Sequence, residues 1–429
     1  MCNMTANRVD PFTCTFCGCL CDDLALTIDG GTIVEARNAC DLARPRLVGL
    51  STARGNEVGD DEPALARAVA LLQAARAPVI VGLGKSSNET VGKAVALADR
   101  IGAVVQVGGP ASGPRITAFQ RGGLVSATLG EVKNRADVVV FWATDPVVTH
   151  PRHWERYSVE PVGRFTPEGR AGRTVVVIDR ERTATAEKAD VFLQVDPQNE
   201  LELLWVLRGL ARGIPMKESR IEHATACGVS DLKNVVELLK LARYGAWFGG
   251  PFAGRGPVAQ AEARHQAVAG LVRDLNSPTS RFVAIGMGEA GNAHGAEAVL
   301  AWQTGLTPSV DLGAEFPEAL PGATSGVERL ARGEADCVVV VGDVTLDDWP
   351  DAARARLGST PWIFVGPPES PLAASATVAL AAATAGLDED GTFTRVDGVS
   401  LPIRAVRDRG LPTEGDRLVA LLSRIEASL

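Results

Sequence analysis

The chain has 429 residues, of which 46% are hydrophobic and 22% are charged, and its formal net charge is -9. This composition is typical of a soluble globular protein, and the length predicts two or three domains. The acidic balance argues against a nucleic-acid partner, which would need clustered lysine and arginine. The first residues lack the features of a signal peptide, and no apolar run approaches the ~20 residues that span a bilayer. We therefore expect a cytoplasmic protein with no membrane partner.

Near the N-terminus lies a cluster of cysteines. Five of the eight cysteines fall between positions 14 and 40, and four of them have the spacing C-x2-C-x3-C with one distant partner: Cys14, Cys17, Cys21 and Cys40. Such a set can hold a [4Fe–4S] cluster, hold a structural zinc ion, or consist of reduced thiols without a metal. The spacing favours the cluster, because zinc sites more often use two separated C-x2-C pairs. Cys19 is the ambiguous member of the group.

The residues after the cysteine loop predict a β-hairpin. Residues 24–28 and 32–36 each alternate between apolar and polar side chains, and Asp29-Gly30-Gly31 supplies the turn between them. This hairpin would bring Cys40 back towards the loop. We expect residues 1–54 to form a small cysteine-rich domain.

From residue 61 onwards the pattern predicts alternating helices and buried strands. We expect a helix over 62–72, followed by a βαβ unit with a parallel sheet. This unit consists of a strand over 78–84, a helix beginning at 88 and a strand over 103–107. The same pattern predicts further strands and helices, and then a loop-rich section over 387–402. The strands are expected at 137–142, 174–179, 282–286, 336–342 and 362–365, and the helices at 200–211, 262–275 and 415–429.

Two loops that follow predicted strands have the composition of ligand-binding loops. Gly82 and Gly84 lie between a strand and a helix, where a loop can hold a phosphate, although their spacing matches neither common nucleotide motif and loop packing is the alternative. The second loop suits a phosphate or a ribose, but it reads equally well as a solvated face. Its candidate residues are Asp179, Arg180, Arg182 and Thr183.

Three histidines are candidates for functional residues. His150 and His153 have ligand chemistry, but their spacing beside a proline and the lack of a nearby carboxylate-bearing helix favour a structural role. His294 lies in a glycine-rich stretch that can line a cleft or form a tight turn.

Several stretches, in order along almost the whole chain, resemble the B subunit of formylmethanofuran dehydrogenase, a molybdopterin or tungstopterin oxidoreductase. The resemblance implies that the four cysteines hold a [4Fe–4S] cluster and that loops after strands hold two pterin guanine dinucleotides. The stretches that carry it are residues 14–23 with 37–40, 128–137, 150–153, 302–305 and 391–399.

The chain departs from that family where the family binds tungsten or molybdenum. The expected Cys-His-Gly-Pro is replaced, so that Ala111 stands at the position of the metal-binding cysteine and Ser112 at that of the histidine. A methyl group cannot coordinate the metal, and a hydroxyl does not readily replace an imidazole in proton transfer. The loop after Val341 also carries three carboxylates, Asp343, Asp347 and Asp348, which would repel a pyrophosphate. We therefore expect no molybdopterin or tungstopterin.

A relative of the dehydrogenase without the metal site is most similar to the B subunit of the bacterial formyltransferase/hydrolase complex. That resemblance implies a non-catalytic subunit in the conversion of formyl-tetrahydromethanopterin to formate through formylmethanofuran. Its partners would be an amidohydrolase-type subunit, a formyltransferase subunit and a further dehydrogenase-like subunit. The alternatives are an active pterin-dependent dehydrogenase subunit and a stand-alone nucleotide- or pterin-binding module.

The resemblance also implies how the domains are arranged. We expect an α/β protein in which the cysteine-rich domain, 1–54, precedes two doubly wound α/β domains, one inserted in the other. The first consists of residues 55–118 and 288–385, the inserted one of residues 119–287, and residues 386–429 form a C-terminal loop and helix.

Overall fold

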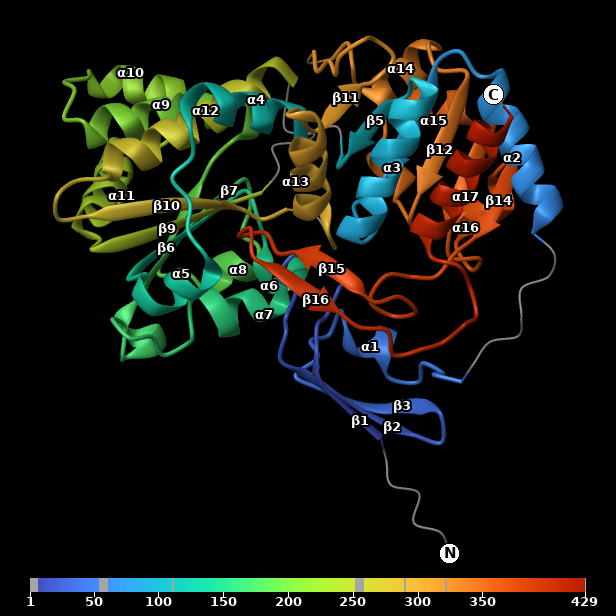
Figure 1. Ribbon diagram of the computed structural model, residues 1–429. Helices are drawn as coiled ribbons and strands as arrows, with labels where there is room; N and C mark the ends of the chain where they lie inside the picture. The colour runs from blue at the N-terminus through green and yellow to red at the C-terminus, as the bar shows by residue number, and fades with distance from the viewer. Residues whose placement is uncertain are drawn as a thin grey trace, which may run out of the picture. The chain divides into compact units, whose positions relative to one another are not determined.

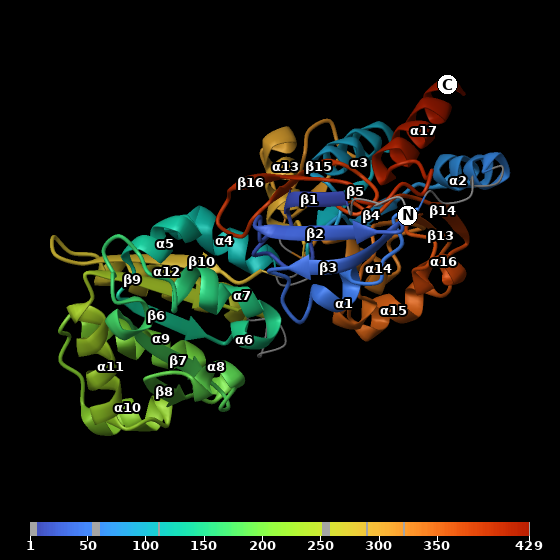
Figure 2. The same ribbon diagram turned by 90° about the horizontal axis from the view of Figure 1, so that it is seen from below.

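The computed structural model describes residues 7–53, 61–109, 112–250, 258–288, 291–320 and 322–428. The chain divides into two compact units, which we call unit 1 (Met1–Gly113 with Glu289–Leu429) and unit 2 (Pro114–Gly288). Each unit contains a largely or wholly parallel sheet with helices packed on it, which confirms the predicted α/β class. Figures 1 and 2 show the elements of each unit.

The sheet of unit 1 has six strands in the order β11-β5-β4-β12-β13-β14. All neighbours are parallel except β11, which is antiparallel to β5. Its central strands are continuous apolar runs because helices cover both of their faces. The strands are β4 (Pro78–Gly82), β5 (Val104–Val107), β11 (Ser309–Asp311), β12 (Cys337–Val341), β13 (Trp362–Gly366) and β14 (Val378–Ala381).

Two groups of helices enclose the unit 1 sheet. Alternate strand residues such as Ile80 and Val339 pack against the first group, whereas Val79 and Val338 pack against the second. The first group is α2 (Glu62–Ala74), α3 (Asn88–Ile101), α13 (Ala293–Thr304) and α17 (Glu414–Ala427). The second is α14 (Gly326–Arg332), α15 (Asp351–Leu357) and α16 (Pro371–Ser375).

The cysteine segment of unit 1 contains a small antiparallel sheet in the order β1-β2-β3. Strands β2 (Leu24–Asp29) and β3 (Thr32–Arg37) form the predicted hairpin, whereas β1 (Asn7–Phe12) was not predicted. A short helix, α1 (Arg44–Leu47), follows Cys40. The C-terminal hairpin of β15 (Gly391–Thr394) and β16 (Ser400–Ile403) packs on this segment, with Leu20 against Phe393.

The sheet of unit 2 has five strands, all parallel, in the order β10-β9-β6-β7-β8. β9 was missed by the sequence analysis because its run Tyr-Gly-Ala-Trp-Phe-Gly carries two strand-weakening glycines. The strands are β6 (Val138–Trp142), β7 (Thr174–Asp179), β8 (Val191–Gln194), β9 (Tyr244–Gly249) and β10 (Arg281–Gly286).

Four long helices cover one face of the unit 2 sheet, and aromatic rings cover the other. On the second face Phe141 stacks on Trp154 and Phe248 at centroid distances of 5.9 and 5.6 Å. The four helices are α9 (Glu200–Ala211), α10 (Glu218–Thr225), α11 (Val229–Leu241) and α12 (Val258–Leu275). The remaining helices are α4 (Ser112–Gly122), α5 (Leu129–Arg135), α6 (Pro146–Thr149), α7 (Pro151–His153) and α8 (Ala184–Glu187).

In the part of the chain that the structure describes, no helix combines the length and the apolar character needed to cross a membrane.

Candidate functional site

The carboxyl ends of β4 and β12 form the point in unit 1 where the sheet reverses its strand order. From β4 the chain passes through α3 to β5 on one side, and from β12 it passes through α15 to β13 on the other. Ligands of open parallel sheets bind at such a point. Gly82 ends β4 with φ +100°, and a Cβ there would lie 2.3 Å from the Val341 carbonyl oxygen. The two strand ends therefore approach each other as closely as glycine allows.

The chain's own side chains link the loops that leave these strands. Lys85 Nζ lies 3.2 Å from Asp343 Oδ2, which joins the loop after β4 to the loop after β12. Ser370 Oγ donates a hydrogen bond of 2.9 Å to Asp343 Oδ1, which adds the loop after β13. The lysine of the predicted phosphate loop is thus neutralised by a carboxylate of the facing loop.

Glu414, the first residue of α17, lies buried at the same place and accepts a hydrogen bond from Ser86 Oγ. Burial raises the pKa of Glu414 to about 8, although the Ser86 hydroxyl partly offsets this, and the charges of Glu389 and Asp343 raise it further. Glu414 is therefore largely a neutral carboxylic acid at neutral pH.

Glu389 is a second carboxyl group beside this loop. Ser87 Oγ donates to its Oε1 at 3.0 Å, and burial is the main cause that raises its pKa to about 7. Lys93 lowers that pKa, whereas Asp416 and Glu89 raise it. The loop after β4 thus has its donors engaged by carboxyl groups of the chain itself, where a dinucleotide site needs free donors.

Asn292, just before α13, connects three segments at this site. Its backbone N–H donates to the Gly84 carbonyl at 2.6 Å, and its Nδ2 donates to the Ser86 carbonyl at 2.9 Å. Its Oδ1 accepts from the Thr394 N–H at 2.7 Å. His294 follows on α13, half-buried, and a Cβ on Gly398 would lie 3.9 Å from its Nε2. The structure therefore brings Gly82, Gly84 and His294 to one region of unit 1.

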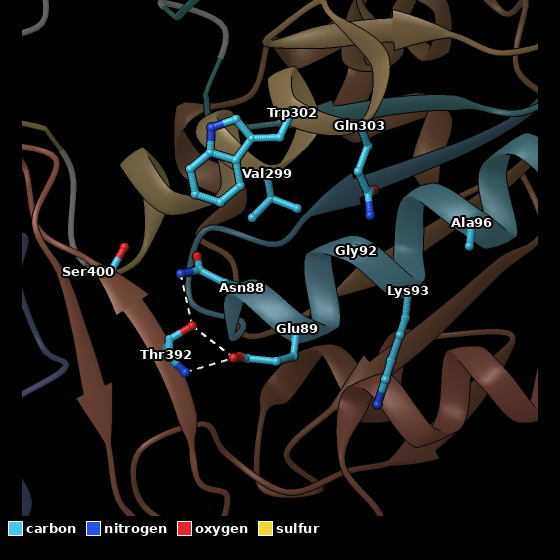
Figure 3. Close-up of a pocket in the computed structure, with 10 residues that line it drawn as sticks. All are labelled: Asn88, Glu89, Gly92, Lys93, Ala96, Val299, Trp302, Gln303, Thr392 and Ser400. Carbon is cyan, nitrogen blue, oxygen red and sulfur yellow. Dashed lines mark hydrogen bonds between the residues drawn. The ribbon is translucent and has the colours of Figure 1, made fainter.

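An open hollow of about 570 Å³ lies between α3 and α13 (Figure 3). Thr392 donates to the Glu89 carboxylate through its backbone N–H at 3.0 Å and its hydroxyl at 2.8 Å. Asn88 Nδ2 donates to Thr392 Oγ1 at 3.1 Å. The residues that line the hollow are Asn88, Glu89, Gly92, Lys93, Ala96, Val299, Trp302, Gln303, Thr392 and Ser400.

The four predicted ligand cysteines lie in one loop region of unit 1. Cys14, Cys17 and Cys21 are buried and Cys40 is half-buried, and the Cys14 N–H donates to the Cys21 carbonyl at 2.9 Å. Burial raises the pKa of Cys14 well above the ordinary thiol value, and the charges of Cys17, Cys21 and Cys40 raise it further. The thiols are therefore close enough to repel one another as thiolates.

Cys19 lies beside Cys17. A hydrogen bond from the Cys19 thiol is the main cause that lowers the pKa of Cys17, and the same contact, with burial, raises the pKa of Cys19. The sulfur of Cys19 thus acts as a donor to Cys17.

The cysteine geometry can be compared with the two metal interpretations. Among the described residues, no three or more His, Cys, Asp or Glu side chains are placed to hold a metal ion. A single zinc ion would need its sulfurs about 2.3 Å from one point. A four-iron cluster offers a separate iron to each thiolate, so its sulfurs need not converge in this way. The gathering of Cys14, Cys17, Cys21 and Cys40 in one loop region is compatible with a core of that larger kind.

The second candidate loop belongs to unit 2, at the end of β7. Asp179 is buried and its Oδ1 accepts from the Arg180 N–H at 2.7 Å. Arg180 pairs with Glu181 at 3.1 Å, and Arg182 lies over the Phe192 ring at 4.9 Å. Thr183 Oγ1 caps α8 by accepting from the Ala186 N–H. Both arginines are exposed and engage neighbours on their own surface.

His150 and His153 lie in unit 2 in different surroundings. His150 Nε2 lies 3.2 Å from the Gly288 carbonyl oxygen, and burial lowers the pKa of His150 to about 4. His153 is fully buried, with its ring edge-on to Phe248 at 4.4 Å and its Nδ1 3.0 Å from Ser158 Oγ. Burial lowers the pKa of His153 to about 3. His153 is a core residue, as the structural interpretation predicted.

Ala111 lies outside the described residues, and Ser112 is the first residue of α4. Sequence reasoning missed Glu414, Glu389 and Asn292. Glu414 is separated from Ser86 by most of the chain, and no local pattern distinguishes it from an ordinary acidic residue at a helix start. The stretches that carry the family resemblance did include Trp302, Gln303 and Thr392, and these meet at the hollow.

Comparison with known proteins gives full-length similarity. The chain is 32% identical to the B subunit of the tungsten-containing formylmethanofuran dehydrogenase 2 of Methanocaldococcus jannaschii, over 97% of this chain and 98% of that protein. It is 27% identical to the B subunit of the formyltransferase/hydrolase complex Fhc of Methylorubrum extorquens, over 65% of this chain and 71% of that protein. No family model matches the chain.

A solved structure has the same fold. A chain of the formyltransferase/hydrolase complex from Methylorubrum extorquens, crystallised with methylofuran, superimposes with a TM-score of 0.70 and 24% sequence identity. The match covers 88% of this chain and 99% of that chain.

Proposed function

The chain belongs to the family of formylmethanofuran dehydrogenase B subunits, and from that premise we propose that it is a redox-inactive structural subunit of a formyltransferase/hydrolase complex. Such a complex converts formyl-tetrahydromethanopterin to formate through formylmethanofuran, in the oxidation of one-carbon units. The likeness to the Fhc B subunit and to a chain of the solved complex supports this assignment.

The observation that carries the proposal is the closure of the strand ends in unit 1. A pterin guanine dinucleotide would have to enter a loop whose Lys85 is paired with Asp343 and whose Ser86 donates to the buried Glu414. A pyrophosphate would have to displace a third carboxyl group as well, since Glu389 accepts a hydrogen bond from Ser87 of the same loop. The polar groups of this loop are therefore paired with groups of the chain itself and do not await a ligand.

The sequence at the metal position agrees with this closure. Ala111 and Ser112 replace the cysteine and the histidine that an active family member needs. An alanine offers no donor atom to tungsten or molybdenum. Loss of the ligand and loss of the dinucleotide site leave the α/β body intact, because the fold depends on core packing.

We propose further that Cys14, Cys17, Cys21 and Cys40 hold a [4Fe–4S] cluster with a structural role. Their burial in one loop region supports a bound core, and thiolate coordination would fix the loop that the C-terminal hairpin covers. When bound, the cluster supplies a covalent tie between the loop and the Cys40 segment. Without a pterin partner, it has no acceptor in this chain.

The proposal also covers the domain organisation and the partners. The division of the chain at Gly113 and Gly288 supports an α/β domain inserted in another. The cysteine segment, which falls within unit 1, remains proposed as a small domain. The partners would be an amidohydrolase-type subunit, a formyltransferase subunit and a further dehydrogenase-like subunit, all in the cytoplasm.

The second candidate function is that of an active pterin-dependent B subunit. The higher identity and fuller coverage of the tungsten enzyme's subunit favour it. It would require a metal ligand other than residue 111.

Metal analysis of the anaerobically purified complex separates the two functions. We expect about four irons with acid-labile sulfide per chain, and no tungsten, molybdenum or extractable pterin. Cys14→Ser should lower the iron content, whereas Cys227→Ser, a buried cysteine outside the cluster, should not. Stoichiometric tungsten or molybdenum with pterin would overturn the structural assignment.

A further inference from the structure

The hollow between α3 and α13 has the form of a docking site for one large side chain. Small or apolar residues, Gly92, Ala96 and Val299, line it, and they leave open space beside the α13 side chains. Trp302 stands at its rim with 69% of its surface exposed (Figure 3). An exposed tryptophan beside a hollow is the residue type that most often anchors a protein interface.

Trp302 differs from the other strongly exposed tryptophan of the chain. Trp205, on α9, is 51% exposed, and the guanidinium of Arg208 lies 4.8 Å above its ring. Within the described ranges, no lysine or arginine stacks on Trp302. Because an indole face attracts cations, the uncovered ring of Trp302 is suited to a cation from outside the chain.

The charges around the hollow also favour a cation. The Glu89 carboxylate is exposed at the rim and is held by two donors of Thr392, neither of which carries a charge. The ammonium group of Lys93 lies 3.6 Å from Asp416 Oδ1, so its charge is already matched. The rim therefore has an excess negative charge on the same hollow that the uncovered aromatic face lines.

The openness of the hollow indicates a protein partner. Small molecules are usually held in pockets that enclose most of their surface. Here the aromatic wall is mostly exposed, and an incoming protein surface would cover it. An arginine combines both required interactions, since its guanidinium stacks on an indole and donates to a carboxylate.

We propose that this hollow receives an arginine or lysine side chain of a companion subunit, with the cationic group between the Trp302 ring and the Glu89 carboxylate. The inference rests on the proposed function, because it takes its partner from the same complex. The inference goes beyond the proposed function in two respects: it names the surface of unit 1 that contacts the companion subunit, and it names the kind of side chain that this surface binds.

The test uses the full chain and its purified companion subunits. Affinity is measured by titration for the wild type, Trp302→Ala, Glu89→Gln and the matched control Trp205→Ala. We expect Trp302→Ala to weaken assembly by about 30-fold or more and Trp205→Ala to leave it unchanged. Glu89→Gln should weaken it by about 3- to 10-fold and reduce its salt dependence.

The outcomes distinguish a failure of the docking surface from a failure of the proposed function. If the wild type assembles and Trp302→Ala assembles as tightly as Trp205→Ala, the docking surface is wrong while the proposed function stands. If Glu89→Gln leaves the affinity and its salt dependence unchanged, the cationic occupant is wrong. Self-association of the isolated chain that Trp302→Ala abolishes would identify a second copy as the occupant instead. Failure of the wild type to assemble would overturn the proposed function itself.

Discussion

The carboxyl ends of β4 and β12 in unit 1 correspond to those of β6 and β9 in unit 2, since both mark the point where the strand order of a parallel sheet reverses. In unit 1 the place is filled by carboxyl groups, Glu414 and Asp343 among them. In unit 2 the strand ends meet through their backbones, because the Gly250 N–H donates to the Trp142 carbonyl at 3.0 Å. The nearby Asp145 carboxylate accepts from the Thr185 N–H and hydroxyl.

The difference shows that topology sets the position of such a site, whereas the side chains around it set its charge. Topology places a gap at the same point in both sheets. In unit 1 two of the carboxyl groups hold protons into the neutral range, because their pKa values are raised to about 7 for Glu389 and about 8 for Glu414. In unit 2 the buried histidines nearby have pKa values of about 4 and 3 and stay neutral there. The two units should therefore respond to pH in opposite directions.

The largest expected effect comes from the glycines that let the strand ends approach. A Cβ on Gly250 would lie 2.0 Å from the Ala143 carbonyl oxygen, and one on Gly82 2.3 Å from that of Val341. Gly250→Ala and Gly82→Ala should each lower the free energy of unfolding by about 4 kcal/mol, because backbone must move. Gly286→Ala, which meets nothing within 4 Å, is the control and should change it little. Urea unfolding measures all three, and equal stability of Gly250→Ala and Gly286→Ala would contradict the backbone contact.

A smaller effect is expected from Glu414→Gln. The pKa of Glu414 is raised from 4.5 to about 8, so the stability contributed by its neutral form is complete below pH 4.5 and is lost as the pH rises through 8. The amide keeps an acceptor for Ser86 but cannot ionise. The variant should be more stable than the wild type by about 3 kcal/mol or more at pH 8.5 and by less than about 1 kcal/mol at pH 5, in urea unfolding. Glu62→Gln, in an exposed pair with Arg424, should show no such gain at pH 8.5.

The smallest effect concerns His153 in unit 2. Its pKa is lowered from 6.5 to about 3, so the stability that its neutral form contributes is present above pH 6.5 and is lost as the pH falls towards 3. From pH 6.5 to 5, amide protection in unit 2 should fall by about 1 kcal/mol, while that in unit 1 holds or rises. Hydrogen exchange resolved by segment measures both units. His153→Phe should reduce this fall without abolishing it, because His150 also has a lowered pKa, and His223→Gln, at an exposed position of α10, should leave the fall unchanged. If amide protection changed with pH in the same direction in both units, the expected opposite response of the two units would be wrong.

The sequence predicted the parts of the fold that depend on local pattern. The apolar run that became β12 and the turn at Gly30-Gly31 both specify their structure within a few residues. The predicted strand 78–84 ends at Gly82 instead, because Leu83 turns with φ +69°. The strand β11, three residues long and joined antiparallel to β5, has too short a pattern to be recognised.

The site was less predictable, for a physical reason. Some site residues can be recognised from the local sequence, because glycine after a strand and regularly spaced cysteines are local patterns: Gly82, Gly84 and Cys14 are of this kind. The role of Glu414 arises only when α17 packs beside the loop after β4. The local sequence does not distinguish a glutamate that a distant segment buries from one that is exposed to solvent.

The cysteine loop is covered by residues from the far end of the chain: Leu20 packs against Phe393 and Ile403, and the Val396 N–H donates to the Gly18 carbonyl at 3.1 Å. During synthesis, the loop therefore emerges long before its cover. Its thiols stay accessible to iron delivery and to oxidation until the C-terminal hairpin has been made and has folded back. In this protein, synthesis of the C-terminal hairpin is the event that covers the cysteine loop.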